Sequence, residues 1–189
     1  MQMENNKEKL GSGNRGWTSN GMKELRDWTL SLGIAITLAM LFQTYAYAQT
    51  EVHNVSMQNT LVEGERLIED KWSYRVSEPK QGDIVIINGP EHELRLVKRV
   101  IALEGQTVDI ADGAVFVDGV RLEEPYAKGE TFPGSLDVPF VVPAGHVLVL
   151  GDNRERSQDS RDFGPVALSS LEGKAVFRIW PVDRIGSLK

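Results

Sequence analysis

The 189-residue sequence has no cysteine, which excludes disulfide bonds, thiol nucleophiles and thiolate metal sites. It has only three histidines, His53, His92 and His146, and none of them belongs to a spaced metal-binding pair such as HExxH. Positive charge is also scarce, because the formal net charge is -6, whereas a nucleic-acid-binding protein is usually basic. These absences argue against a zinc site and against a nucleic-acid partner.

Two common catalytic motifs are missing as well. No serine lies in a GxSxG elbow, and no glycine-rich loop suited to a phosphate group occurs. The spacing does not exclude a Ser-His-Asp triad, because such triads assemble in space rather than in sequence. Each of the three histidines is, however, more typical of a surface or loop residue.

One long stretch carries no charged residue: from Trp28 to Ala48 the sequence reads WTLSLGIAITLAMLFQTYAYA. About 20 helical residues span roughly 30 Å, the thickness of the hydrocarbon core of a bilayer. Aromatic residues stand at both ends of the stretch, basic Lys23 and Arg26 precede it, and acidic Glu51 follows it. By the positive-inside rule, this pattern predicts a single transmembrane helix with a cytoplasmic N-terminus.

Two other interpretations of this stretch stay open. A core helix is disfavoured by the length and the lack of charge. A cleaved signal peptide is suggested by Ala46-Tyr47-Ala48, which has the A-x-A pattern, but the region ahead of the stretch is long for such a peptide. We therefore expect residues 1–27 to form a flexible cytoplasmic tail, residues 28–48 an anchor, and residues 49–189 a domain outside the membrane.

Beyond residue 50, short runs of β-type residues alternate with turn residues. Two Asp-Gly pairs, Asp112-Gly113 and Asp118-Gly119, separate three of these runs and predict a three-stranded meander. We predict a mainly β fold, in which the outer domain is all-β and about residues 105–145 form a small inserted lobe. The expected strands are residues 83–87, 94–102, 107–110, 114–117, 120–122, 146–150 and 175–180.

Three segments contain residue types that a plain β fold does not explain. Ser56 lies among apolar neighbours in VSMQNTL, close to the predicted membrane edge. Lys98 stands in the apolar run LRLVKRVI, where a lysine usually reaches the surface. Because Lys98 and Arg99 point to opposite faces, at least one charge faces the core, unless the strand is at an edge or bulged. The third segment, GDNRERSQDSRDFGPV at 151–166, is either a solvated loop or a buried network that supports a site.

These segments resemble, in order, the sequence boxes of bacterial type I signal peptidases: SMQNTL (56–61), GDIVI (82–86), KRVIALEGQTV (98–108) and GDNRERSQDSRDFGPV (151–166). The resemblance runs from about residue 23 to the C-terminus, and the single predicted span is similar to Gram-positive members. It implies a membrane-bound serine endopeptidase that removes N-terminal signal peptides from exported preproteins after small residues of the Ala-x-Ala type. It further implies no cofactor and no metal, and we expect a monomer in the cell membrane.

The resemblance also implies which residues act. Ser56 is the nucleophile, and Lys98 is the general base that takes its proton. Since the pKa of free lysine is about 10.4, a basic role for Lys98 requires burial that lowers its pKa. The side chain of Asn54 is expected to donate to the oxyanion.

The last box supplies support residues by the same resemblance. Ser157 matches the position whose hydroxyl contacts the catalytic lysine, and Asp159 and Arg161 match a structural ion pair. Substrate is expected to bind as an extended strand beside shallow pockets. The expected residues of the first pocket wall are Met57, Leu61, Leu96 and Val97.

The sequence departs from the family at one position of the first box, where Asn59 replaces the usual proline. Proline would fix φ and stiffen the turn after the nucleophile. Asn59 therefore leaves open one alternative function, a catalytically weak or inactive membrane-anchored binding domain of the same family. A self-cleaving Ser/Lys protease of the repressor type also stays open, because it uses the same pair of residues. A further hypothesis is self-cleavage after Ala48, because Ala46-Tyr47-Ala48 resembles the substrate rule of the family.

Overall fold

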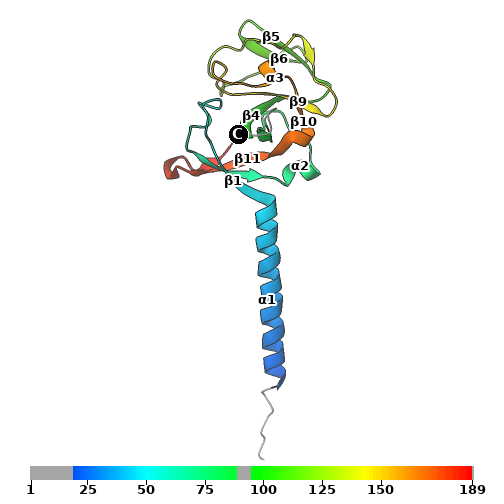
Figure 1. Cartoon of the computed structure of the whole chain (residues 1–189), viewed down its shortest axis with the longest axis vertical. Helices are drawn as coiled ribbons and strands as arrows, with labels where there is room; N and C mark the ends of the chain where they lie inside the picture. Colours follow the sequence, from blue (N-terminus) through cyan, green and yellow to red (C-terminus); the bar gives the residue numbers. More distant parts are fainter. Residues whose placement is uncertain (1–18, 89–94, 189) are drawn as a thin grey trace, which may run out of the picture. The chain divides into compact units, whose positions relative to one another are not determined.

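The computed structural model describes residues 19–88 and 95–188. The first 18 residues of the predicted cytoplasmic tail therefore lie outside the described residues, as does Leu94 at the start of one expected strand. The chain divides into two compact units, Met1–Phe42 and Gln43–Lys189. Most of helix α1 belongs to the first of these, and the strands labelled in Figure 1 belong to the second.

Helix α1 (Ser19–Ala46) covers most of the uncharged stretch, and its large apolar side chains between Trp28 and Met40 are exposed. The stretch does not stay helical to its predicted end at Ala48. Ala48 belongs instead to strand β1 (Tyr47–Glu51), where it pairs with Glu69. Within residues 19–88 and 95–188, no helix combines the length and the hydropathy needed to cross a membrane, so the predicted transmembrane helix is not confirmed.

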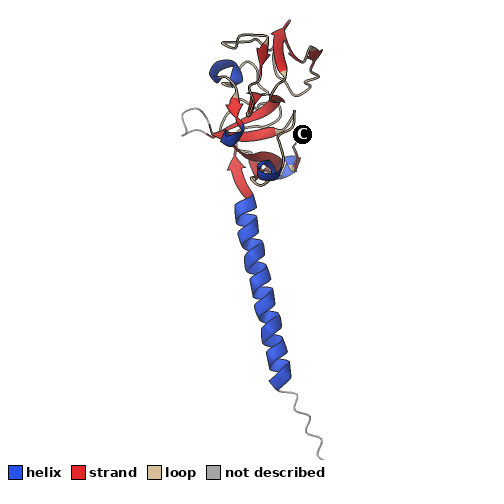
Figure 2. Cartoon of the chain, turned by 90° about the vertical axis from the view of Figure 1, so that its right-hand side faces the viewer, coloured by secondary structure: helices blue, strands red, loops and turns tan. Residues whose placement is uncertain are grey.

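The second unit has the mainly β fold that the sequence predicts, and its strands pair in antiparallel fashion (Figure 2). The larger sheet has the strand order β1-β2-β11-β3-β4-β9-β10, and β12 also pairs with β11. Its remaining strands are β2 (Arg66–Asp70), β3 (Ile84–Asn88), β4 (Arg95–Ala102), β9 (His146–Leu150), β10 (Val166–Ala167), β11 (Leu171–Trp180) and β12 (Gly186–Ser187). Strands β1 and β2 were not expected from the sequence.

Helices in the second unit are short. They are α2 (Ser73–Val76) and α3 (Ser160–Phe163), together with the 3-10 turns η1 (Leu168–Ser170) and η2 (Val182–Arg184). Asp159 caps the start of α3, where its side chain accepts a hydrogen bond from the backbone N–H of Arg161. Asp162 completes a reciprocal capping box, so this single turn is fixed by local side chains.

The smaller sheet has the order β7-β6-β5-β8, formed by β5 (Thr107–Ala111), β6 (Ala114–Val117), β7 (Val120–Arg121) and β8 (Phe140–Val141). The two predicted Asp-Gly turns are confirmed. Asp112 and Asp118 have positive φ angles of 50° and 52°, and each is followed by a glycine that also has positive φ. Such turns match the twist of the strands that they join.

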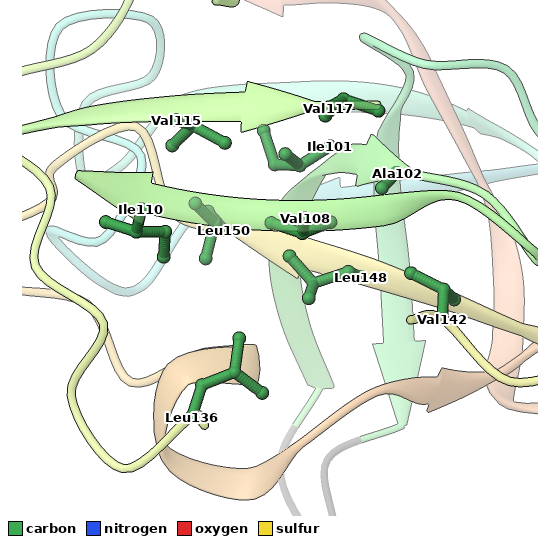
Figure 3. Close-up of a cluster of buried hydrophobic side chains, with 10 residues drawn as sticks. All are labelled: Ile101, Ala102, Val108, Ile110, Val115, Val117, Leu136, Val142, Leu148 and Leu150. Carbon is green, nitrogen blue, oxygen red and sulfur yellow. The ribbon is translucent and has the colours of Figure 1, made fainter. Parts of the chain in front are cut away.

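The smaller sheet packs on the ends of β4 and β9 through a cluster of aliphatic side chains, which we call the apolar lobe cluster (Figure 3). Alternation along β5 and β6 places Val108, Ile110, Val115 and Val117 on the covered face. The members of the cluster are Ile101, Ala102, Val108, Ile110, Val115, Val117, Leu136, Val142, Leu148 and Leu150.

Candidate active site

Ser56 lies in a turn between β1 and β2 and is only 5% exposed. Backbone hydrogen bonds from Thr60 and Leu61 to the carbonyl of Met57 shape the turn, with distances of 3.1 and 2.8 Å. The side chains of Met57 and Leu61 are fully buried and anchor it in the core. The carbonyl of Ser56 accepts a hydrogen bond from the N–H of Asn153 at 2.9 Å, so the nucleophile position is held from two sides.

Asn59 occupies this turn with a φ of 96°. Proline, whose ring holds φ near -65°, is unable to adopt that conformation. The neighbours of Asn59 are fixed nonetheless. Gln58 accepts from Lys128 at 3.3 Å, and Thr60 donates to Asp152 and accepts through its carbonyl from Arg178 at 3.0 Å. These contacts hold the turn in the absence of a stiffening proline.

Lys98 lies opposite Val85 in the pairing of β3 and β4, and it is only 1% exposed. Its Nζ donates a hydrogen bond to Oγ of Ser56 at 2.8 Å. Arg99 is equally buried, so both neighbouring charges are covered, although the two side chains leave the strand on opposite faces. The structure therefore brings together the two residues that are predicted from the sequence resemblance to be the nucleophile and the base.

Burial is the main influence on the protonation of Lys98, because it disfavours the charged ammonium. The nearby carboxylates of Asp159 and Asp152 oppose this effect, and the guanidinium of Arg161 adds to it. Together these influences lower the pKa of Lys98 from 10.5 to about 8. At pH 7 roughly one Lys98 in ten is then neutral, compared with about one in 2,500 for a free lysine.

Asn54 contacts Ser56 in a different way from the one expected. Its Oδ1 accepts from Oγ of Ser56 at 2.7 Å and from the backbone N–H of Ser56 at 3.2 Å. The side chain acts here as an acceptor and points its oxygen at the nucleophile. Before Asn54 can donate to an oxyanion, its side-chain amide has to flip, so that Nδ2 takes the place of Oδ1.

Asp159 and Arg161 form a buried ion pair with two hydrogen bonds of 2.8 and 2.9 Å. Burial opposes ionisation of Asp159, but the hydrogen bonds and charge of Arg161 outweigh it and lower the pKa of Asp159. Asp159 also accepts from the N–H of Gly151 at 3.0 Å. The pair therefore supports the loop beside Lys98, in the arrangement expected from the last sequence box.

Ser157 is not brought into hydrogen-bonding contact with Lys98. Its Oγ is buried without a hydrogen bond of good geometry to any described residue, although the hydroxyl is near enough to Asp159 to help lower the pKa of that carboxyl. It packs directly on Gly151, where an added Cβ would lie 2.1 Å from Oγ of Ser157 and 2.5 Å from the carbonyl oxygen of Ser56. Only glycine fits between these two serines.

The expected pocket residues divide between two clusters. Met57, Leu61 and Val97 belong to one buried cluster, whereas Leu96 packs against another. The reason is the alternation of side chains along β4, which sends neighbours to opposite faces. Leu96 therefore lies on the face of β4 that carries Lys98, and Val97 lies on the face that carries Arg99.

Arg99 and Asp152 form a second buried ion pair, which the sequence analysis missed. Arg99 donates to both carboxylate oxygens of Asp152 at 2.9 and 2.8 Å, to the carbonyl of Gly82 at 2.9 Å, and stacks 3.9 Å from the ring centre of Tyr126. We call the buried charged residues around the site the buried charge network. Its members are Lys98, Arg99, Asp152, Asp159 and Arg161.

The arrangement is suited to acyl transfer with a serine nucleophile and an amine base. Within residues 19–88 and 95–188, no three histidine, aspartate or glutamate side chains gather as a metal site would require. The polar groups close to Ser56 are the amine of Lys98, the amide of Asn54 and backbone N–H groups.

Comparisons with known proteins agree with this geometry. The family model described as signal peptidase, peptidase S26, matches residues 25–180. The chain is 37% identical over 166 residues to signal peptidase I of Leptolyngbya laminosa, covering 84% of this chain and 81% of that one. It is 36% identical over 178 residues to signal peptidase I of Bacillus licheniformis, covering 89% and 95%.

Two further similarities complete the comparison. The thylakoidal processing peptidase 1 of Arabidopsis thaliana is 32% identical over 186 residues, which are 92% of this chain and 54% of that one. A crystal structure of a signal peptidase I from Enterococcus faecalis is 35% identical and matches with a TM-score of 0.47, covering 52% of this chain and 97% of that one.

Proposed function

The chain belongs to the signal peptidase family of peptidases, S26, and from this premise we infer that its signal-peptide-removing serine endopeptidase activity uses Ser56 as nucleophile and Lys98 as general base. The observation that supports this assignment is the 2.8 Å hydrogen bond between Nζ of Lys98 and Oγ of Ser56, in a setting where both residues are buried. A nucleophile and its base need this proximity for direct proton transfer.

In the acylation step, the Ser56 hydroxyl turns its proton from Oδ1 of Asn54 to Nζ of neutral Lys98, which takes the proton as Oγ bonds to the scissile carbonyl carbon. The carbonyl oxygen becomes an oxyanion, which the backbone N–H of Ser56 can stabilise once Asn54 releases it. The carbon–nitrogen bond then breaks, and the ammonium of Lys98 returns the proton to the leaving amine. In the second half, Lys98 takes a proton from water as the water oxygen bonds to the ester carbon. The bond between that carbon and Oγ then breaks, Oγ of Ser56 takes the proton back from Lys98, and the signal peptide leaves with a new carboxyl end.

The substrate specificity for small residues before the cut belongs to this proposal too. Met57 and Leu61 pack in the apolar cluster that anchors the turn of Ser56, and Leu96 lies on the same face of β4 as Lys98. Together with Val97 these side chains are the proposed wall of the first pocket. An extended substrate segment beside β4 would bring small side chains against this wall. Alanine at the first and third positions before the cut suits such shallow contacts.

The location is proposed from the sequence and from the helix. We place residues 28–46 in the cell membrane, residues 1–27 in the cytoplasm and residues 47–189 outside, because Tyr47 and Ala48 already pair with β2. About 105–145 form an inserted lobe, and the chain is a monomer. The support is the uncharged stretch and the exposed apolar side chains of α1. Protease treatment of intact protoplasts should degrade the domain but spare a tag at the N-terminus, and degradation of both would contradict this topology.

The function is tested by incubating detergent-solubilised full-length protein with a preprotein that ends its signal peptide in Ala-x-Ala. Wild type should cleave after the second alanine, and Ser56→Ala and Lys98→Ala should each lower kcat/KM by at least about a thousand-fold. Exposed Ser169→Ala and Lys80→Ala serve as matched controls and should keep the activity of wild type. Equal processing by Lys98→Ala would contradict the Ser/Lys assignment.

A further inference from the structure

A cavity of about 570 Å³ lies next to the active site, between the loop at residues 129–134 and the last sequence box. Its lining includes Gly129 and Gly134 on one side, and Glu155, Ser157 and Arg161 on the other. This volume is within the range of cavities that hold ligands. None of the roles assigned above uses this space.

Ser157 connects the cavity to the nucleophile. It lines the cavity and also packs on Gly151, whose added Cβ would meet both Ser157 and the carbonyl oxygen of Ser56. The cavity is therefore separated from the nucleophile by the thickness of one peptide backbone. Arg161, another lining residue, is close enough to affect the charge of Lys98.

The walls of the cavity are held in place by backbone hydrogen bonds. Ser135 donates to the carbonyl of Arg161 at 2.9 Å, and Arg154 donates to the carbonyl of Lys128 at 3.0 Å. An added Cβ at Gly129 would lie 2.6 Å from Cγ of Glu155, so the walls approach closely at that point. The space is thus preformed and does not depend on a loop closing.

The charge of the cavity is negative. Its two arginines are already paired, Arg154 with Glu124 at 2.6 Å and Arg161 with Asp159 at 2.8 Å. Glu130 and Glu155 are exposed and form no ion pair with any residue that the structure describes. Both carboxylates are therefore available to a ligand.

We propose that this cavity receives the first residues after the cut, the start of the mature protein, and that Glu130 and Glu155 favour basic over acidic side chains there. The inference rests on the proposed function. In the proposed function the segment before the cut lies along β4, so the segment after it leaves past Ser56 on another side. The polar cavity at Ser157 offers that exit.

The chemistry of the product fits the same site. Cleavage creates a new amino terminus, which takes up a proton and becomes a positively charged ammonium in water. A cavity with free carboxylates attracts this group and any basic side chains that follow it. Because the carboxylates are exposed, each contributes modestly, and salt weakens the effect.

The test uses three peptides that share one Ala-x-Ala end and differ only at the second and third positions after the cut, with two lysines, two glutamines or two glutamates. Wild type should cleave the lysine peptide with a kcat/KM roughly ten-fold above that of the glutamate peptide. In the double variant Glu130→Gln/Glu155→Gln this ratio should fall toward one. The control Glu63→Gln/Glu78→Gln changes two exposed carboxylates outside the cavity and should keep the ratio of wild type.

An unchanged ratio in Glu130→Gln/Glu155→Gln would overturn the inference. A second measurement needs no variant: raising the salt from about 20 mM to about 500 mM should shrink the ratio in wild type, and a constant ratio would overturn the inference as well. Failure of the proposed function gives a different result, because wild type would then leave the glutamine peptide uncut or Ser56→Ala would cut it equally.

Discussion

The apolar lobe cluster and the buried charge network are both almost fully buried, but they stabilise the fold in opposite ways. The lobe cluster contains only aliphatic side chains, and each of them gains free energy by leaving water. The charge network loses hydration on burial and depends on the pairs Arg99–Asp152 and Arg161–Asp159 to compensate. One region therefore tolerates a change of shape at moderate cost, whereas the other fails when a single partner is removed.

The largest effect is expected at Lys98, the member of the network without an ion-pair partner among the described residues. Lys98→Met should lower kcat/KM for a preprotein by at least about a thousand-fold. It should also raise the stability at pH 7 by about 3 kcal/mol, because the buried ammonium costs free energy when the pKa of Lys98 falls from 10.5 to about 8. Peptide cleavage and urea unfolding measure the two effects.

The pH dependence of stability follows from the same shift at Lys98. Between about pH 8 and pH 10.5 the unfolded chain binds more protons than the folded chain, so the stability of wild type should rise with pH in this window. Lys98→Met should remove that rise. If Lys98→Met were less stable than wild type at pH 7, this would contradict the conclusion that burial of the Lys98 ammonium costs free energy.

The second effect concerns an ion pair. Asp152→Ala should lower the free energy of unfolding by about 3–5 kcal/mol, because Arg99 is left buried without its partner. The control is Glu172→Ala, which removes a partner of the half-exposed Arg95 and should cost less than about 1 kcal/mol. Similar losses in the two variants would mean that burial does not distinguish the pairs.

The third effect is in the apolar lobe cluster. Val115→Ala deletes two buried methyl groups and should cost about 1–3 kcal/mol in urea unfolding. At a temperature where the variant is folded, its kcat/KM should stay within about two-fold of wild type, because Val115 belongs to the smaller sheet, whereas Ser56 lies in the turn between two strands of the larger sheet. Val120→Ala, at a position 67% exposed on the neighbouring strand, should change stability by less than about 0.5 kcal/mol.

The smallest effect is expected at the border of the charge network, in the turn after Ser56. Asn59→Gly should keep stability within about 0.5 kcal/mol, since glycine accepts a φ of 96°. Asn59→Pro should cost about 1 kcal/mol and lower cleavage, because the turn has to rearrange around its contacts to Asp152 and Arg178. Faster cleavage by Asn59→Pro than by wild type would show that a different turn is the active one.

The contrast between the apolar lobe cluster and the buried charge network also explains which features the sequence could predict. The strands and Asp-Gly turns of the small sheet follow from local patterns, and β6 and β9 have the expected bounds. The pairing of Ser56 with Lys98 was expected only through the resemblance to a family, since 42 positions separate the two residues. The Arg99–Asp152 pair carries no local signal, because its members come from a strand and a distant loop.

Other features of the site differ in how far the sequence could predict them. The alternation of β4 separates Leu96 from Val97, and this division between two faces was predictable from the sequence. The positive φ of Asn59 was not predictable, because the usual residue of the family at this position favours a negative φ. The orientation of Asn54 likewise depends on atoms that only the folded turn brings together.

The isolated parallel bridge between Lys128 and Asn153 has a consequence for pharmacology. The backbone N–H of Lys128 donates to the carbonyl of Asp152 at 2.7 Å. The backbone N–H of the following residue, Asn153, donates to the carbonyl of Ser56. A compound that separates the two residues of this bridge would displace the nucleophile without occupying the substrate site at Ser56 and Lys98. Its inhibition would be noncompetitive, and an abundance of preprotein would not relieve it.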